Sequence, residues 1–232
     1  MATLYNPSIV KNGLVFYLDA ANSRSYPGSG TTWTDLSGNG NNGTLTNGPS
    51  YNALNNGSIV FDGTDDYISI PNSTSLQVSN NFTINAWIYA TNLSNRYAIF
   101  STRTQNTAGC WQLEVGTGSY TGGTSGINRV AVTGVGTWIY ESGNSIINLN
   151  TWTNICYVSS TNTMYVNGVV IPAAVAQAYT ISNNSDIKSI GSGTGLAQFF
   201  PGKISNILLY NIPLTQTQVL QNFNATKGRY GL

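Results

Sequence analysis

Short apolar runs alternate with clusters of Gly, Asn, Ser and Thr along almost the whole chain. Several runs have a period of two: in the segment FTINAWI, Phe82, Ile84, Ala86 and Ile88 would share one face of a strand. Repetition of this pattern between turn clusters is typical of an all-β domain. It predicts strands at residues 14–18, 58–61, 67–70, 82–89, 98–101, 111–115, 130–133, 137–140, 152–158, 163–166, 187–190 and 203–210.

Two local signals predict particular elements. Asn167-Gly168 separates two β-rich runs, MYV and VV, and this pair suits a type I′ turn because both central residues need positive φ. Near the end of the chain, Thr215 followed by Gln218 has the spacing of a helix capping box. The residues Val219, Leu220 and Phe223 would form the apolar stripe of this helix, and Gly228 would end it.

No stretch of the chain has the composition of an interdomain linker, and no repeat of 20–50 residues occurs. A β-sandwich of ~200–250 residues commonly forms one domain. The sequence therefore predicts a single domain over residues 1–232, with an N-terminal arm at 1–12 and a helix and tail at 213–232.

Charged residues make up only 7% of the chain, against roughly 25% in an ordinary soluble domain. The net charge of +1 provides no field that would attract nucleic acid or an anionic membrane. No apolar segment approaches the ~20 residues of a membrane span, so no membrane insertion is expected. The N-terminus lacks a secretory signal, whereas the charge-poor, Asn- and Gly-rich composition resembles that of proteins found outside cells. A virion component, made in a host cytoplasm and released by lysis, reconciles these observations; an extracellular location is the alternative.

Cys110 and Cys156 both lie in strand-like segments. One interpretation is two small buried apolar residues, and the other is a disulfide between neighbouring strands. The sequence leaves both open.

Six motifs in order resemble laminin-G-like domains of the concanavalin-A-like lectin/glucanase superfamily. They lie at residues 13–19 (GLVFYLD), 33–43 (WTDLSGNGNNG), 61–67 (FDGTDDY), 82–88 (FTINAWI), 152–168 (from Trp152 to YVNG) and 200–210 (FPGKISNILLY). The resemblance implies a jelly-roll sandwich of two antiparallel sheets with one short C-terminal helix. It also implies glycan or protein binding, sometimes through calcium. The opening segments, 6–10 and 19–22, are similar to domains of phage structural proteins.

The inventory of reactive side chains argues against an enzyme. The chain has no histidine, which excludes His-based triads and His-ligated zinc. Glu114 and Glu141 are the only glutamates, and neither has a second acid nearby in the sequence. Glycoside hydrolysis needs two carboxylates ~5–10 Å apart, and Glu114 and Glu141 could meet only across strands. We interpret both as solvated strand residues and predict no catalytic residue.

The sequence does not require a cofactor, and calcium is the one cofactor that it suggests. Asp35, Asn39 and Asn41 lie in one loop, and Asp65 and Asp66 form a second candidate, because oxygen-rich loops suit Ca²⁺. The competing interpretation is turn chemistry, in which these side chains bond to neighbouring backbone groups.

Exposed aromatic rings are the candidates for stacking on sugars. Trp87, Trp111 and Trp152 lie within strand patterns and are predicted to be core residues. The rings expected to face a glycan lie in or beside segments rich in Gly, Ser and Thr: Trp33, Tyr26, Tyr120 and Trp138. The loop at residues 116–126 is the first place to look.

The leading functional hypothesis is a phage virion-associated structural protein, a capsid decoration or tail/fibre component, whose lectin-like domain serves adhesion. Its expected partners are other virion proteins, host or environmental glycans, and further copies of the chain in a trimer. A cellular glycan-binding module is the alternative, and a polysaccharide-cleaving enzyme ranks below it.

Overall fold

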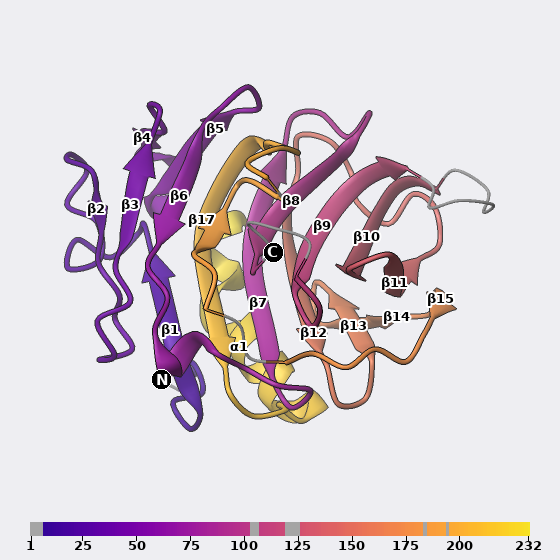
Figure 1. Cartoon of the computed structure of the whole chain (residues 1–232). Helices are drawn as coiled ribbons and strands as arrows, with labels where there is room; N and C mark the ends of the chain where they lie inside the picture. The colour runs from indigo at the N-terminus through magenta and orange to yellow at the C-terminus, as the bar shows by residue number, and fades with distance from the viewer. Residues whose placement is uncertain (1–6, 103–106, 119–125, 183–184, 194) are drawn as a thin grey trace, which may run out of the picture.

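Two antiparallel sheets stack face to face in the computed structural model, which describes residues 7–102, 107–118, 126–182, 185–193 and 195–232 (Figure 1). One α-helix follows the last strand. The predicted fold class, an all-β jelly-roll sandwich with a short C-terminal helix, is confirmed.

The first sheet carries the C-terminal helix on its outer side. Strand β17 is its centre, because its first half pairs with β5 and its second half with β1, while β7 pairs along the other edge. In spatial order the strands are β14 (Val169–Ile171), β13 (Thr163–Val166), β12 (Trp152–Val158), β7 (Thr83–Ala90), β17 (Pro201–Tyr210), β5 (Ser58–Asp62) and β4 (Ser50–Asn52), with β1 (Leu14–Asp19) beside β17.

The second sheet lies opposite the first. In spatial order its strands are β15 (Ala173–Ala176), β11 (Thr137–Ser142), β10 (Gly126–Gly134), β9 (Trp111–Gly118), β8 (Arg96–Ser101), β16 (Lys188–Ile190), β6 (Tyr67–Ile70), β3 (Gly43–Thr46) and β2 (Thr32–Trp33). Short 3₁₀ turns occur at Leu54–Asn56, Thr74–Leu76 and Lys227–Tyr230. Every strand predicted from the sequence is present, whereas β2, β3, β4 and β15 were not predicted.

Strand β7 is buried on both of its faces. Ile84, Ala86 and Ile88 point into the core between the sheets, as the period-two pattern predicted. The alternate residue Trp87 points outward and stacks on Tyr230 and Phe223 of the C-terminal segment, with ring centroids 4.0 and 5.7 Å away. The two periodic faces of one strand therefore serve two separate apolar layers. The predicted burial of Trp87, Trp111 and Trp152 is confirmed.

Helix α1 (Gln216–Thr226) covers the outer face of the first sheet (Figure 1). The predicted capping box is confirmed, since the Thr215 hydroxyl accepts from the Gln218 N–H and Gln218 Oε1 accepts from the Thr215 N–H. The predicted stripe is wrong at Leu220, which is 36% exposed, because the buried helix positions are Val219, Asn222 and Thr226. The predicted stop at Gly228 is also wrong. The chain continues there as a 3₁₀ turn and reverses at Gly231 with φ 76°.

The hairpin between β13 and β14 is confirmed. Asn167 and Gly168 have φ values of 50° and 77°, as a type I′ turn requires. Both cysteines are buried thiols, so the disulfide alternative is wrong. Within the described ranges, no helix has the length and apolar composition needed to cross a membrane.

Candidate functional site

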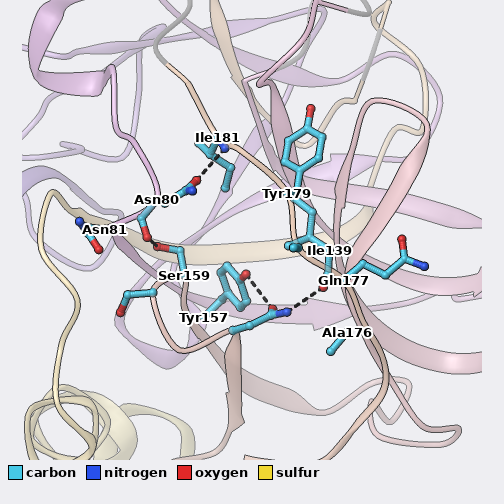
Figure 2. A pocket seen from close by; sticks show the side chains of 12 residues that line it. Asn80, Asn81, Ile139, Tyr157, Ser159, Ala176, Gln177, Tyr179 and Ile181 are labelled. Carbon is cyan, nitrogen blue, oxygen red and sulfur yellow. Dashed lines mark hydrogen bonds between the residues drawn. The ribbon is translucent and has the colours of Figure 1, made fainter.

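A cavity of about 410 Å³ opens at one end of the sandwich, where the two sheets meet (Figure 2). The β12–β13 turn forms one wall, the segment after β15 forms another, and the residues before β7 close the rim. Its lining residues are Asn80, Asn81, Ile139, Tyr157, Ser159, Ser160, Asn162, Ala176, Gln177, Ala178, Tyr179 and Ile181. The volume lies within the ~300–1,000 Å³ that is usual for small-molecule sites.

Asn162 connects the two sheets at the base of this cavity. Its backbone is left-handed, with φ 47°, a conformation that asparagine tolerates well. Its Oδ1 accepts from the Tyr157 hydroxyl at 2.9 Å, and its Nδ2 donates to the Ile139 carbonyl of the second sheet at 2.9 Å. Burial raises the pKa of Tyr157, so this hydroxyl stays neutral and the base of the cavity is rigid and uncharged.

Tyr179 provides a fixed, half-buried aromatic ring. Its hydroxyl points away from Tyr157 in Figure 2, donates to the Cys110 carbonyl and accepts from the Gly109 and Val135 N–H groups, each at 3.1 Å. Gly134 packs against the ring, and a Cβ there would lie 2.5 Å from Cζ of Tyr179. A glycine at position 134 therefore makes room for the ring.

The rim presents amide and hydroxyl groups. Asn80 is held in place, because its Oδ1 accepts from the Ile181 N–H at 2.6 Å and its carbonyl accepts from the Ser159 hydroxyl at 2.7 Å. The Gln177 Oε1 accepts from the Thr137 hydroxyl at 2.6 Å. Within the described part of the chain, no hydrogen bond engages the amide nitrogens of Asn80 and Gln177 or the side chain of Asn81. These groups remain available to a ligand.

The chemistry of the cavity follows from this lining. Among its described residues, none is Asp, Glu, Lys or Arg. A charged ligand would lose hydration there without gaining an ion pair, whereas hydroxyl groups could exchange hydrogen bonds with the rim amides. The geometry suits a neutral, polyhydroxylated molecule that lies beside the Tyr179 ring.

The aromatic residues predicted to face a glycan are elsewhere. Trp33 and Tyr26 are 0% and 4% exposed and belong to the core between the sheets, so their predicted exposure is wrong. The short strand β2 turns the Trp33 ring inward, and Tyr26 donates its hydroxyl to the Gly30 carbonyl. Trp138 is 6% exposed, because the guanidinium groups of Arg129 and Arg96 cover its ring at 4.0 and 4.8 Å. Tyr120 lies outside the described residues, as does most of the 116–126 loop.

The predicted calcium residues Asp35, Asn39 and Asn41 lie together in one loop. The Asp35 carboxylate accepts from the backbone N–H groups of Tyr17, Ser37 and Asn41 and from the Ser37 hydroxyl. Both asparagines donate to the Val15 carbonyl. These bonds match the turn interpretation, because the polar atoms are already used to fix the loop.

Asp65 and Asp66 come together with a third acid, Asp62, and their carboxylate oxygens lie within 4.8 Å of one another. Burial raises the pKa of Asp66, and the charges of Asp62 and Asp65 add to this, although an N–H from Asp62 opposes it. The Thr64 N–H lowers the pKa of Asp62. Calcium binding at these residues stays a prediction.

The interpretation of the two glutamates as solvated strand residues is wrong. Glu114 is fully buried on the outer face of the second sheet. Its carboxylate accepts from Arg96, Arg129, Gln112 and Thr133. Glu141 binds the other side of Arg129, with Oε1 3.0 Å from Nε. The antiparallel register brings them together, since Ala131 pairs with both residues.

A family model described as "Concanavalin A-like lectin/glucanases superfamily" (Laminin_G_3) matches residues 62–220. A search of curated proteins by sequence found no match. Among solved structures, the chain is similar to domain 4 of AbnA, a GH43 extracellular arabinanase from Geobacillus stearothermophilus, in complex with arabinotriose. The TM-score is 0.67 at 18% identity, over 91% of this chain and 98% of that one.

Two binding domains of toxins are also similar. The binding domain of Paraclostridial Mosquitocidal Protein 1 has a TM-score of 0.64 at 19% identity, over 93% of this chain and 52% of that one. The receptor binding domain of Botulinum Neurotoxin Type G has a TM-score of 0.61 at 18% identity, over 91% and 51%. The chain therefore spans about half the length of these toxin domains, and the likeness at this identity is one of fold.

Proposed function

Because the chain belongs to the concanavalin A-like lectin/glucanase superfamily, we propose that it is an adhesion module that binds a neutral oligosaccharide in the cavity around Tyr179. One observation carries this proposal: the described residues of the lining include no charged side chain, and amide groups at the rim have no hydrogen-bond partner among the described residues. Sugar hydroxyls are both donors and acceptors, so the rim amides complement them without the cost of pairing a buried charge.

The aromatic and amide groups have distinct roles in this proposal. The Tyr179 ring, fixed by its three hydroxyl hydrogen bonds, offers an apolar surface to a sugar ring. Asn81 and Gln177 donate to sugar hydroxyls. A rigid site loses little conformational entropy on binding, which favours affinity.

The structural relatives support a binding role. The arabinanase domain was solved with arabinotriose, and the two toxin domains are binding domains. Arabinotriose is therefore a rational first probe. Titration of a panel of neutral oligosaccharides beside arabinotriose then identifies the saccharide that this chain prefers.

We propose that the module has no catalytic role. Both oxygens of Glu114 are occupied by donors from Arg96, Arg129, Gln112 and Thr133, and Glu141 is paired with Arg129. The Glu114 carboxylate therefore has no free lone pair with which to attack or deprotonate a substrate. The glutamates support the sheet instead.

The virion role remains our proposal for the biological setting, as capsid decoration or as part of a tail or fibre. The sequence similarity of the opening segments to phage structural proteins motivates it. Mass spectrometry of purified particles tests it: the chain should be present in stoichiometric amounts, and its absence from particles would favour a cellular glycan-binding module.

Isothermal titration with arabinotriose and a panel of neutral oligosaccharides tests the binding site. The double variant Asn81→Ala/Gln177→Ala should bind at least about tenfold more weakly, a loss of about 1.4 kcal/mol. Asn148→Ala/Gln216→Ala removes two exposed amides that lie outside the cavity lining and should bind like the wild type. Equal losses in both double variants, or no binding to any saccharide of the panel, would refute the proposal.

A further inference from the structure

A second cavity, of about 370 Å³, lies between the N-terminal segment, the chain after β1 and the C-terminal 3₁₀ turn. It shares no lining residue with the cavity around Tyr179. Lys11, Arg24 and Arg229 line it, together with Tyr17, Asn22 and apolar groups that include Leu36. Its volume is again that of a small-molecule site.

Positive charge is concentrated at this cavity. The chain has nine Lys and Arg residues, and three of them line this one site. All eight acidic side chains belong to described residues, and none of them is part of the lining. In a protein with so few charges, this grouping provides the local field that the net charge of +1 does not reveal.

Two carboxylates bond to lining residues from behind: Asp35 accepts from the Tyr17 N–H, and Asp19 is paired with Arg229. Asp19 is fully buried, and its oxygens accept from Arg229 Nη1 at 2.9 Å, from the Tyr17 hydroxyl at 2.7 Å and from the Ala21 N–H at 3.0 Å. This pairing cancels the charge of Arg229 and fixes its guanidinium at the cavity. Among the described residues, neither carboxylate forms a salt bridge with Lys11 or Arg24.

Local contacts fix the backbone at Arg24 and place the Lys11 ammonium beside Tyr17. The Arg24 N–H donates to Asn22 Oδ1 at 3.0 Å, which fixes the turn that carries the guanidinium. The Lys11 ammonium lies 5.8 Å from the centroid of the Tyr17 ring. In the described part of the chain, neither Lys11 nor Arg24 forms an ion pair.

We propose that this cavity binds a small molecule through an oxyanion group, a carboxylate, phosphate or sulfate, held between Lys11 and Arg24. The planar guanidinium of Arg24 donates two parallel hydrogen bonds to such a group, and the ammonium of Lys11 supplies a second charge. The apolar wall at Leu36 excludes part of the water that would screen the interaction. The two cavities thus select opposite ligand chemistry, neutral in one and anionic in the other.

Titrations of the full chain with inorganic sulfate, inorganic phosphate and glucuronate test this site, followed by ¹H–¹⁵N NMR at constant ionic strength set with NaCl. We expect saturable shifts at residues of the cavity, and the rank order of the three probes identifies which oxyanion is preferred. Lys11→Gln and Arg24→Gln should each weaken binding by at least about tenfold.

Lys203→Gln is the matched control, because Lys203 lies over the Tyr89 ring on strand β17 and is not part of this lining. It removes the same charge and should leave the affinity within about twofold of the wild type. Linear, non-saturating shifts for all three probes, or an equal loss in Lys203→Gln, would overturn the proposal. Arabinotriose binding by Lys11→Gln and Arg24→Gln should be unchanged, which separates this site from the oligosaccharide site.

Discussion

The Glu114 carboxylate lies 3.4 Å from the Arg129 guanidinium, and both side chains are fully buried on the outer face of the second sheet. Arg96 adds a shorter contact of 2.7 Å to the same carboxylate, and Glu141 contacts Arg129 at 3.0 Å. Two acids and two bases thus alternate across β8, β9, β10 and β11. The charges that this protein does carry are used in part to join four adjacent strands.

Removing the central charge should destabilise the fold. Glu114→Gln leaves Arg96 and Arg129 without their shared carboxylate, and breaking a buried pair in this way costs about 3–5 kcal/mol. Glu141→Gln should cost less, because the Glu141 side chain is 12% exposed and, among the described residues, forms an ion pair with Arg129 alone. Urea unfolding followed by tryptophan fluorescence measures both. Equal costs, or a loss below about 1 kcal/mol for Glu114→Gln, would contradict the network described here.

Two substitutions at Tyr179 separate the contribution of the aromatic ring from that of the hydroxyl group. Tyr179→Ala removes the ring and should weaken arabinotriose binding by at least about tenfold. Tyr179→Phe keeps the ring but removes the hydroxyl that contacts Gly109, Cys110 and Val135, so binding should persist while stability falls by about 1–3 kcal/mol. Calorimetric titration and urea unfolding of the two variants provide the measurements. If Tyr179→Phe loses as much affinity as Tyr179→Ala, the ring is not the contact surface.

Lys188 should make stability depend on alkaline pH. Burial lowers its pKa to about 8, although Asp186 opposes the shift, and its ammonium donates to the Asp186 carbonyl at 2.7 Å. Between this value and the ordinary lysine pKa, the unfolded chain holds a proton that the folded chain has lost. Lys188 therefore contributes a rise in the free energy of unfolding with pH in that window, of about 2 kcal/mol between pH 8 and pH 9.5.

Lys188→Met should remove this rise, since methionine does not titrate. Urea unfolding of both proteins at pH 7.5 and pH 9.5 gives the difference. Burial raises the pKa of Cys156 to about 12, so this thiol contributes a change of opposite sign, which is common to both proteins and cancels in the difference between them. The same slope in wild type and variant would show that another group is responsible.

The capping box of α1 gives a local test of the C-terminal segment. Thr215→Ala removes the hydroxyl that accepts from the Gln218 N–H, and should cost about 1 kcal/mol of unfolding free energy. Thr217→Ala, an exposed change inside the same helix, is the matched control and should be nearly neutral. A cost for Thr217→Ala equal to that of Thr215→Ala would remove the capping explanation.

Structural elements that depend on neighbouring residues could be predicted from the sequence. The Asn167-Gly168 turn and the Thr215 cap each depend on positions within a few residues, and both are present in the structure. The period-two pattern of β7 was also sufficient to place its residues in the core. The fold class followed from such local patterns together with the motif order.

The candidate site could not be read in this way. It joins Asn80, Ile139, Asn162 and Tyr179, which come close only when two sheets stack and their ends align. The aromatic residues chosen from the sequence failed because flanking Gly and Ser do not report the direction of a ring, as Trp33 shows. A polar turn such as 159–162 gives no signal that a partner wall exists.

The Asn167-Gly168 turn is also a site where asparagine can deamidate. A glycine after asparagine leaves the next backbone nitrogen unhindered, so asparagine side chains at such pairs cyclise and hydrolyse to aspartate more readily than elsewhere. The same pair occurs at Asn12, Asn39, Asn42, Asn47 and Asn56. Each conversion adds one negative charge to a protein whose net charge is +1, so the first neutralises it and the second reverses its sign. Deamidation at these turns therefore changes the net charge of the protein from positive to negative over time.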